Sequence, residues 1–261
     1  YFRFKYRFFR FFIISKKTCI CMLSKSQIKL ITSLRQKKFR TQHQLFFAEG
    51  VKTINELLNS KFKLHQLYTT RSDFDVKDVL QTKITPNELQ KISTLKTPND
   101  VFALFEIPEG ENVDFNNLVV ALDNLRDPGN LGTIIRLCDW FGIKDLICNT
   151  ETVDCYNPKV IQATMGSITR VNVVYKDLSQ ILKDTSITSF GAFMDGENVY
   201  HSTLPNKGIL VLGNEANGIQ NDIEGLITKR ISIPRFGDLQ QTESLNVANA
   251  AAILLSEFRR S

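Results

Sequence analysis

The chain has 261 residues, of which 43% are hydrophobic, so it can form two modest domains or one large one around an ordinary core. The longest candidate membrane segment, residues 8–14, contains an arginine and is far too short to cross a bilayer, so we expect no membrane partner. The formal net charge of +6 equals the six Lys and Arg of residues 1–21, so residues 22–261 are neutral as a whole.

The first 21 residues differ from the rest of the chain. They hold eight Phe or Tyr and no acid, and ordinary patterned sequence begins just after Met22. Arginines interrupt the apolar run and no small-residue cleavage site follows, which argues against a targeting peptide. We therefore expect residues 1–21 to be a non-native or disordered extension, with Met22 as the true start.

The neutral remainder hides an asymmetry of charge. Residues 22–105 hold 14 Lys or Arg against 7 Asp or Glu, whereas residues 106–261 hold 13 against 20. A chance surface imbalance would explain this, but a basic module joined to an acidic one also indicates a polyanion bound mainly by the first. We favour a nucleic acid.

The five cysteines are unevenly spaced and form no CxxC pair after Met22. This is neither a disulfide framework nor a zinc site, and reduced thiols in the cytoplasm are the plain interpretation.

The first part of the chain predicts a small α/β domain. Helices are expected at residues 27–36, 50–59 and 86–95, and strands at 46–50, 64–69 and 101–105. Thr85 is a good cap for the third helix, with proline next and Glu88 third. The polar residues 108–112 indicate a linker, so we place this domain at residues 22–107 and the linker at 108–116.

From residue 118 onward, short apolar strands alternate regularly with helices. The expected strands are 118–122, 145–148, 171–174, 189–194, 209–213 and 230–233, and the expected helices are 131–141, 158–165, 178–183 and 244–258. This alternation predicts an α/β domain, at residues 117–261, with a parallel sheet covered on both faces.

The first candidate motif opens a helix. Residues 127–130, Asp-Pro-Gly-Asn, are typical of a turn between a strand and a helix, and Asn130 is a natural cap. Arg136 projects roughly opposite the apolar face of that helix. It is either a solvated helix residue or a guanidinium that grips a phosphate or ribose at a cleft.

The second motif is the loop Gly-Asn-Glu-Ala-Asn-Gly that runs from Gly213 to Gly218 after an apolar strand. Two glycines let a backbone approach a ligand closely, although an ordinary strand end would look the same. Glu215 is either a solvated acid or a buried acceptor that organises the loop. The GxGxxG pattern is absent after the first strand, which disfavours a nucleotide-dependent enzyme with a doubly wound sheet.

The third motif follows Pro234 and a mostly polar loop, where Ser244-Leu245-Asn246 opens the last helix. Ser244 is a good N-cap, which explains it structurally. Asn246, expected inside the first turn, is less well explained by capping.

In this order and spacing the three motifs resemble those of the SpoU (TrmH-like) RNA 2′-O-ribose methyltransferases. The matched positions are Asn130 with Arg136, Gly213-x-Glu215-x-x-Gly218, and Ser244-Leu245-Asn246-Val247. The first domain is also similar to the RNA substrate-binding domain of that family, in residues 47–50 and in Thr97-Pro98.

The resemblance implies a second domain threaded into a deep trefoil knot and a homodimer with its active site near the subunit interface. It also implies that S-adenosylmethionine binds largely to backbone groups of the knot loops. The corresponding positions here are Leu212, Gly213, Gly218, Ile233 and Leu245.

The implied reaction is attack of a ribose 2′-hydroxyl on the sulfonium methyl. It needs no metal, and the three histidines are isolated in the sequence. By resemblance Arg136 is the candidate base, but a guanidinium is hard to deprotonate, so orienting ribose and phosphate is an easier role. Asn130, Glu215, Ser244 and Asn246 would shape the site by hydrogen bonding.

The chain departs from the family pattern in two places. The loop between Pro234 and Ser244 is longer than the commoner form, with Arg235 where Met is frequent, and Ala248 stands where many members have a second serine. We nevertheless expect a cytoplasmic, homodimeric enzyme that methylates ribosomal RNA. Transfer RNA is the alternative substrate, and a catalytically silent RNA-binding protein on the same fold is the competing hypothesis.

Overall fold

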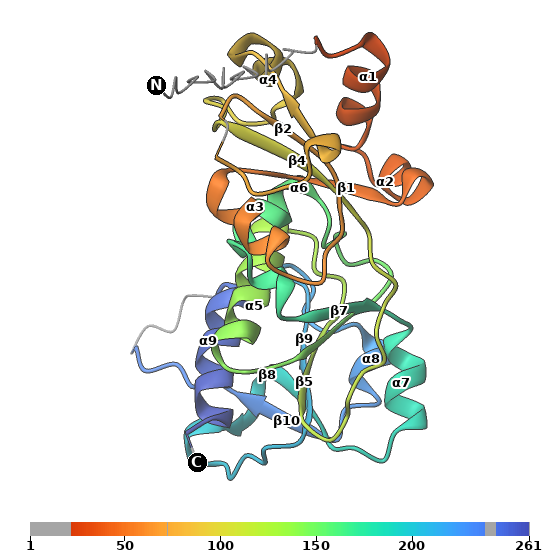
Figure 1. Ribbon diagram of the computed structural model, residues 1–261. Coiled ribbons are helices and arrows are strands. Elements are labelled where there is room, and N and C mark those ends of the chain that lie inside the picture. The colour runs from red at the N-terminus through yellow and green to blue at the C-terminus, as the bar shows by residue number, and fades with distance from the viewer. Residues whose placement is uncertain (1–21, 72, 238–243, 261) are drawn as a thin grey trace, which may run out of the picture.

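Figure 1 shows the computed structural model, which describes residues 22–71, 73–237 and 244–260. The predicted extension at residues 1–21 lies outside the described residues, as does part of the loop before the last helix. The chain forms a four-stranded sheet in the order β1-β4-β2-β3 and a six-stranded sheet in the order β10-β8-β9-β5-β6-β7. Among the described helices, none combines the length and the apolar composition needed to cross a bilayer.

We call the elements from α1 to β4 the N-terminal unit. Its central strand β4 (Val101–Glu106) is antiparallel to both β1 (Leu45–Glu49) and β2 (Leu64–Thr69), and β3 (Gln81–Lys83) runs parallel to β2. Its helices are α1 (Lys25–Ser33), α2 (Lys37–His43), α3 (Val51–Leu58), the 3-10 turn η1 (Asp78–Leu80) and α4 (Pro86–Ile92). The capping box predicted for α4 is confirmed, since the Thr85 hydroxyl accepts from the Glu88 N–H and the Glu88 carboxylate accepts from the Thr85 N–H.

The helix predicted over residues 27–36 is present as α1, but it ends at Ser33, and the second helix that follows it is not among the predicted elements. The chain turns at residues 34–36 and continues into a second helix, α2. The sequence of α2, Lys-Lys-Phe-Arg-Thr-Gln-His, has a single large apolar side chain and so gives no apolar stripe. The residue that anchors this helix in the protein is instead the buried Arg40.

We call the elements from β5 to α9 the C-terminal unit. All of its described strand pairs are parallel, and the strands are β5 (Leu118–Leu122), β6 (Asp145–Cys148), β7 (Asn172–Tyr175), β8 (Ser189–Asn198), β9 (Gly208–Leu212) and β10 (Lys229–Ser232). Its helices are α5 (Pro128–Trp140), α6 (Pro158–Thr164), α7 (Leu178–Asp184), α8 (Asn221–Glu224) and α9 (Val247–Phe258), with 3-10 turns η2 (Ser167–Thr169) and η3 (Val199–His201).

Helices cover both faces of the six-stranded sheet. Leu118, Val120 and Leu122 of β5 pack with side chains of α5 and α9, whereas Val119 and Ala121 pack with side chains of α7 and α8. The predicted α/β fold with a parallel sheet buried on both faces is therefore confirmed. Because the strands are parallel, β5, β9 and β10 all end at one edge, and the three sequence motifs follow these ends.

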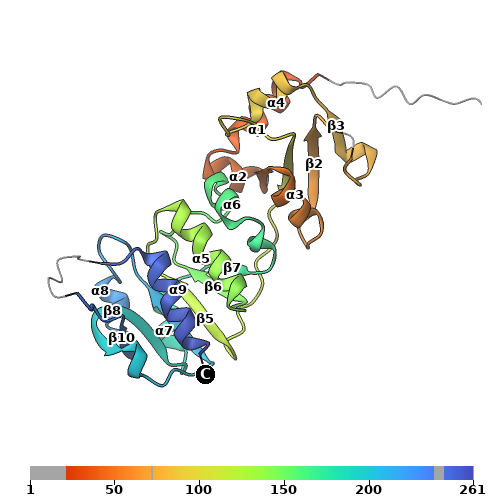
Figure 2. The same cartoon turned by 90° about the vertical axis from the view of Figure 1, so that its left-hand side faces the viewer.

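The two units share one continuous apolar core. The Tyr156 ring of the C-terminal unit lies 4.8 Å from the Phe46 ring and 6.4 Å from the Phe62 ring, measured between centroids. Figure 2 shows α6 lying against the N-terminal unit, and α6 is in contact with β1.

A buried ion pair crosses the same boundary. The Arg40 guanidinium of α2 is 2% exposed, and its Nε donates to Asp154 Oδ2 at 2.8 Å. Its Nη1 donates to the carbonyl oxygens of Leu34 and Arg35 at 2.8 and 3.1 Å. Since buried charges are tolerated when paired and hydrogen-bonded, these contacts fix α2 against the C-terminal unit.

We expect Arg40→Met to lower the free energy of unfolding by about 3 kcal/mol, because the largely buried Asp154 carboxylate would lose its cation. The matched control is Lys63→Met, which removes the exposed ion pair with Glu106 and should change stability by less than about 1 kcal/mol. Urea unfolding of both variants measures the difference. Equal effects would contradict a structural role for the buried pair.

Candidate active site

Side chains from three distant segments meet at the carboxyl edge of the six-stranded sheet. The Asn130 Nδ2 donates to Glu215 Oε1 at 2.7 Å, and the Asn246 Nδ2 donates to Asn130 Oδ1 at 3.0 Å. These residues belong to α5, to the loop after β9 and to the start of α9. Three of the five residues predicted to be catalytic thus form one hydrogen-bonded cluster, which we call the edge cluster.

Asn246 is the N-cap of α9, and this fixes the direction of the hydrogen bonds in the edge cluster. Its Oδ1 accepts from the N–H groups of Ala248 and Asn249 at 2.9 and 3.3 Å, so its Nδ2 is the group that faces Asn130. The prediction that Ser244 caps this helix is wrong. The chain is still extended at Asn246, so the helix begins at Val247 and Ser244 lies exposed before it.

Asn130 is likewise not the cap of α5. Asp127 caps this helix, its Oδ1 accepting from the Asn130 N–H at 2.8 Å, and Pro128 is the first helical residue. The helix therefore begins at Pro128 rather than at residue 131. Because Asp127 satisfies the backbone, the Asn130 side chain is available to contact Glu215.

The loop after β9 folds back tightly on Gly213. Asn214 and Gly218 exchange two backbone hydrogen bonds of 2.8 and 3.0 Å. A Cβ on Gly213 would lie 2.1 Å from the carbonyl carbon of Gly218, so only glycine fits there. Gly218 has a φ of +68°, which also favours glycine. The loop geometry itself therefore requires both glycines.

The other predicted site residues are placed without hydrogen bonds to the edge cluster. Arg136 is exposed on α5, and within the described ranges its side chain makes no hydrogen bond or ion pair. Leu212 is buried at the end of β9, Ile233 is half-buried just past β10, and Leu245 is 49% exposed before α9. The structure brings Leu212, Ile233 and Leu245 to the same edge of the sheet as the edge cluster.

Sequence reasoning missed a buried polar network behind the edge cluster. Asp123 is the first residue after β5 and Asn149 the first after β6, and they are hydrogen-bonded to each other. Burial raises the pKa of the Asp123 carboxyl, and the N–H of Gln220 opposes that shift. The available signal was a polar residue directly after a fully apolar strand, at the edge where all strands end.

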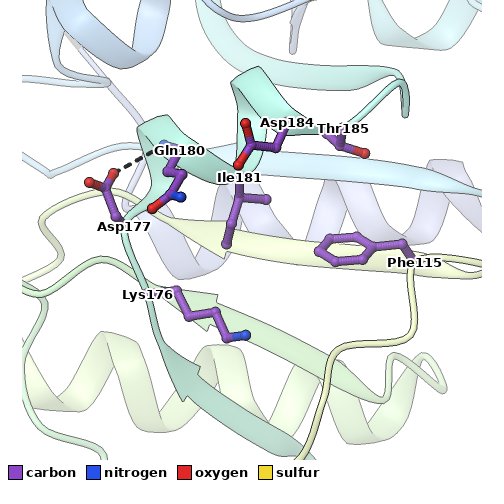
Figure 3. A pocket seen from close by; sticks show the side chains of 7 residues that line it. All are labelled: Phe115, Lys176, Asp177, Gln180, Ile181, Asp184 and Thr185. Atoms are coloured by element: carbon purple, nitrogen blue, oxygen red, sulfur yellow. Dashed lines mark hydrogen bonds between the residues drawn. The ribbon is translucent and has the colours of Figure 1, made fainter.

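An open hollow of about 530 Å³ lies elsewhere, along α7 (Figure 3). It is lined by Phe115, Lys176, Asp177, Gln180, Ile181, Asp184 and Thr185. Lys176 and Asp177 follow the carboxyl end of β7, and Phe115 precedes the amino end of β5, so the hollow runs along α7 between the two edges of the sheet. Its lining includes no residue of the three motifs. We therefore do not take it as the candidate site.

The described cysteines offer no reactive thiolate. Cys138, Cys148 and Cys155 are buried, and burial raises the pKa of each thiol. In the part of the chain that the structure describes, no group of three or more His, Cys, Asp or Glu side chains could hold a metal ion. At the edge cluster the structure offers two amides, one carboxylate and nearby backbone groups.

Comparison with protein families decides what kind of protein this is. The model of the SpoU rRNA Methylase family matches residues 117–256, more than half of the chain. The chain belongs to that family. A second model, the MRM3-like substrate binding domain, matches residues 25–103. The resemblance derived from the three motifs is thereby confirmed.

Individual members of the SpoU family align over nearly the whole chain. The 23S rRNA (guanosine(2553)-2'-O)-methyltransferase RlmP of Bacillus subtilis is 28% identical over 241 residues, which are 89% of this chain and 96% of that protein. A putative RNA methyltransferase of the TrmH family from Porphyromonas gingivalis is 38% identical with a TM-score of 0.83, covering 92% of this chain and 99% of the other. An AdoMet-bound rRNA methyltransferase from Sinorhizobium meliloti is 27% identical with a TM-score of 0.81, covering 92% and 97%.

We expect Asn246→Ala to lower the free energy of unfolding by about 1 kcal/mol, because two N–H groups of α9 lose their acceptor. Ser244→Ala should change it by less than about 0.5 kcal/mol, since an exposed residue outside the cap is replaced. Asn246→Asp keeps an acceptor at the cap and serves as the control. Chemical unfolding compares the three variants, and a larger loss in Ser244→Ala than in Asn246→Ala would reverse the assignment of the cap.

Proposed function

We propose that this protein transfers the methyl group of S-adenosylmethionine to a ribose 2′-hydroxyl of RNA, and that the RNA is ribosomal. The edge cluster carries the proposal, because it joins one residue from each of the three motifs within the region matched by the SpoU family. The names of the relatives, which include a 23S rRNA 2′-O-methyltransferase, support ribosomal RNA over transfer RNA.

The carboxyl edge of the sheet fits the cofactor. Nothing lies within 4 Å of the position that a Cβ on Gly218 would occupy, so a ligand can approach the backbone of the loop closely there. The Cβ position of Gly213 is instead filled by the returning backbone of Gly218 and Ile219. Ile233 and Leu245 are partly exposed and offer apolar surface for the adenine, next to the strand end at Leu212. S-adenosylmethionine bound there would supply a methyl group on a positively charged sulfur, the electrophile of the reaction.

Arg136 is assigned the role of orienting the RNA. A guanidinium stays protonated at any physiological pH, so it suits a phosphate or ribose oxygen better than it suits a proton acceptor. Its exposed position on α5 leaves it accessible to such a group. Asn130, Glu215 and Asn246, held to one another, would shape the pocket in which the 2′-hydroxyl and the methyl group meet. Ser244 lies exposed two residues before Asn246.

A homodimer is part of the proposal. Trp140 lies four residues beyond Arg136 on α5, so the two share a face, and its side chain is 83% exposed. Exposed tryptophans are typical of interface hot spots. A second copy of the chain that covers Trp140 would also lie close to Arg136. Formation of the dimer would therefore complete the active site.

The N-terminal unit is proposed to bind the RNA. Residues 22–48, which include α1 and α2, contain no acid and present exposed Lys25, Lys29, Arg35, Lys37 and Lys38. Such a surface supplies the charge that a phosphate backbone requires. The division of the chain at residues 22–107, 108–116 and 117–261, which is predicted from the sequence pattern, belongs to the same proposal. So do the trefoil knot, which the resemblance implies, and the cytoplasmic location.

Methyl transfer to RNA tests the proposal directly. The protein, started at Met22, is incubated with labelled S-adenosylmethionine and total ribosomal or transfer RNA from cells that lack the gene. We expect label in a 2′-O-methyl nucleoside of ribosomal RNA. Label in transfer RNA would move the substrate to that class, and RNA binding without cofactor binding would favour the catalytically silent protein.

We expect Arg136→Ala to reduce methyl transfer by at least about 100-fold while S-adenosylmethionine binding stays within about threefold of the wild type, since the side chain contacts RNA rather than cofactor. Lys183→Ala, which removes an exposed basic residue from α7, is the control. Single-turnover rates and calorimetric binding provide the two readouts. Normal turnover in Arg136→Ala would remove Arg136 from the site.

We expect the double variant Lys37→Glu and Lys38→Glu to raise the KM for RNA and to flatten its salt dependence. Loss of two phosphate contacts should reduce the slope of log affinity against log salt by about 1.4 to 1.8. Lys207→Glu, at the amino end of β9 and so at the opposite edge of the sheet, is the matched control. Equal effects of both changes would show that α2 does not contact RNA.

A further inference from the structure

Directly behind the edge cluster lies a carboxylate that has no part in the reaction described above, the side chain of Asp123. It follows the last residue of β5 and is 0% exposed. Burial of an ionised carboxylate is strongly unfavourable unless its oxygens are hydrogen-bonded. Both oxygens are: Oδ1 accepts from Asn149 Nδ2 and Oδ2 accepts from the Gln220 N–H, each at 2.7 Å.

The Asn149 amide can be oriented in only one way. Its Oδ1 accepts from the N–H groups of Asn124 and Thr152, both at 3.0 Å, and from the Thr152 hydroxyl at 2.8 Å. Its Nδ2 must therefore point at Asp123 as a donor. Asp123 is thus faced by two donors and has to accept on both oxygens, which an ionised carboxylate can do and an amide cannot.

Asp123 and its neighbour hold both ends of the loop after β9. At the start of the loop, Asn214 Nδ2 donates to the carbonyl oxygen of Asn124 at 2.7 Å. At its end, the Gln220 N–H is held by Asp123. Between these two anchors lies Glu215, which accepts from Asn130 in the edge cluster.

We infer that Asp123 is a positioning residue for S-adenosylmethionine, acting through the loop and not by contact with the reacting groups. By fixing Gln220 it keeps the backbone of residues 213–218 in one conformation at the cofactor site. A loop released at one end would spend less time in the binding-competent form, and the affinity for cofactor falls in proportion. The inference rests on the proposed function.

The variant Asp123→Asn tests the inference. An amide has a single oxygen, so one of its N–H groups must face either the Gln220 N–H or Asn149 Nδ2, and one anchor is lost. We expect the Kd for S-adenosylmethionine to rise about tenfold, equivalent to about 1.4 kcal/mol. The KM for cofactor should rise by a larger factor than kcat falls, because the loop is positioned again once cofactor is saturating.

A second substitution separates this role from a general loss of packing. In the combined variant Asp123→Asn with Asn149→Asp, the new carboxylate at position 149 accepts hydrogen bonds from all the donors that now face Asn149 Oδ1. It also accepts a hydrogen bond from the new amide at position 123. The oxygen of that amide accepts from Gln220, so every hydrogen bond is restored. We expect the affinity of the combined variant for S-adenosylmethionine to return to within about threefold of the wild type. The single variant Asn149→Asp places two carboxylates next to each other, so we expect it to bind S-adenosylmethionine more weakly than the wild type.

Amide hydrogen exchange without ligand keeps the inference distinct from the proposed function. The Gln220 N–H should exchange faster in Asp123→Asn and recover its protection in the combined variant. If the wild type binds no S-adenosylmethionine, the proposed function fails, and the exchange rates still decide whether Asp123 holds the loop. Unchanged cofactor affinity and exchange in Asp123→Asn, or no recovery in the combined variant, would overturn the inference.

Discussion

In a parallel sheet that is buried on both faces, polar side chains are accommodated where the strands end, and this constraint governs the C-terminal unit. Strands β5 and β9 are buried and apolar throughout, yet Asp123 and Asn214 follow them within two residues. Polar groups buried at such an edge have to satisfy one another, because little water reaches them. The network around Asp123 results from this requirement, whereas Glu215 and Asn246 of the edge cluster are exposed to solvent. The loops at this edge are therefore already held in place by hydrogen bonds in the protein without a ligand.

The same apolar core that covers the sheet also joins it to the N-terminal unit. Units of one chain commonly move relative to each other unless their contact is large and apolar. Here Phe46 and Tyr156 belong to one core cluster, and Arg170 adds ion pairs to Glu56 at 2.6 Å and to Asp139 at 2.9 Å. The basic surface of α1 and α2 thus stands at a fixed distance from the carboxyl edge. An RNA bound to this basic surface, as proposed, would therefore present a defined part of its chain to the carboxyl edge.

Much of the fold can be predicted from the sequence, because a short apolar run with polar residues at both ends is compatible with few structures other than a buried strand. Strands β2, β5 and β6 are predicted with the bounds they have in the structure. Strand β8 extends beyond residue 194, where its prediction ends, because Glu197 and Asn198 pair with β10 after an irregularity in register. Their polar side chains give no sign of a strand in the sequence.

The caps and part of the site depend on contacts that local sequence does not encode. Asp127 rather than Asn130 caps α5, and Asn246 rather than Ser244 caps α9, because the chain turns where Asn130 and Asn246 can meet each other and Glu215. The position of Asp123 directly after an apolar strand is a signal in the sequence, but its burial is not, since a carboxylate after a strand is ordinarily solvated.

The buried Arg40 has a consequence for evolution as well. A half taken from a chain that lacks the matching residue would leave Arg40 or Asp154 without its partner inside the protein. Exchange of one half for another therefore keeps the stability of the protein only when positions 40 and 154 remain a matched pair.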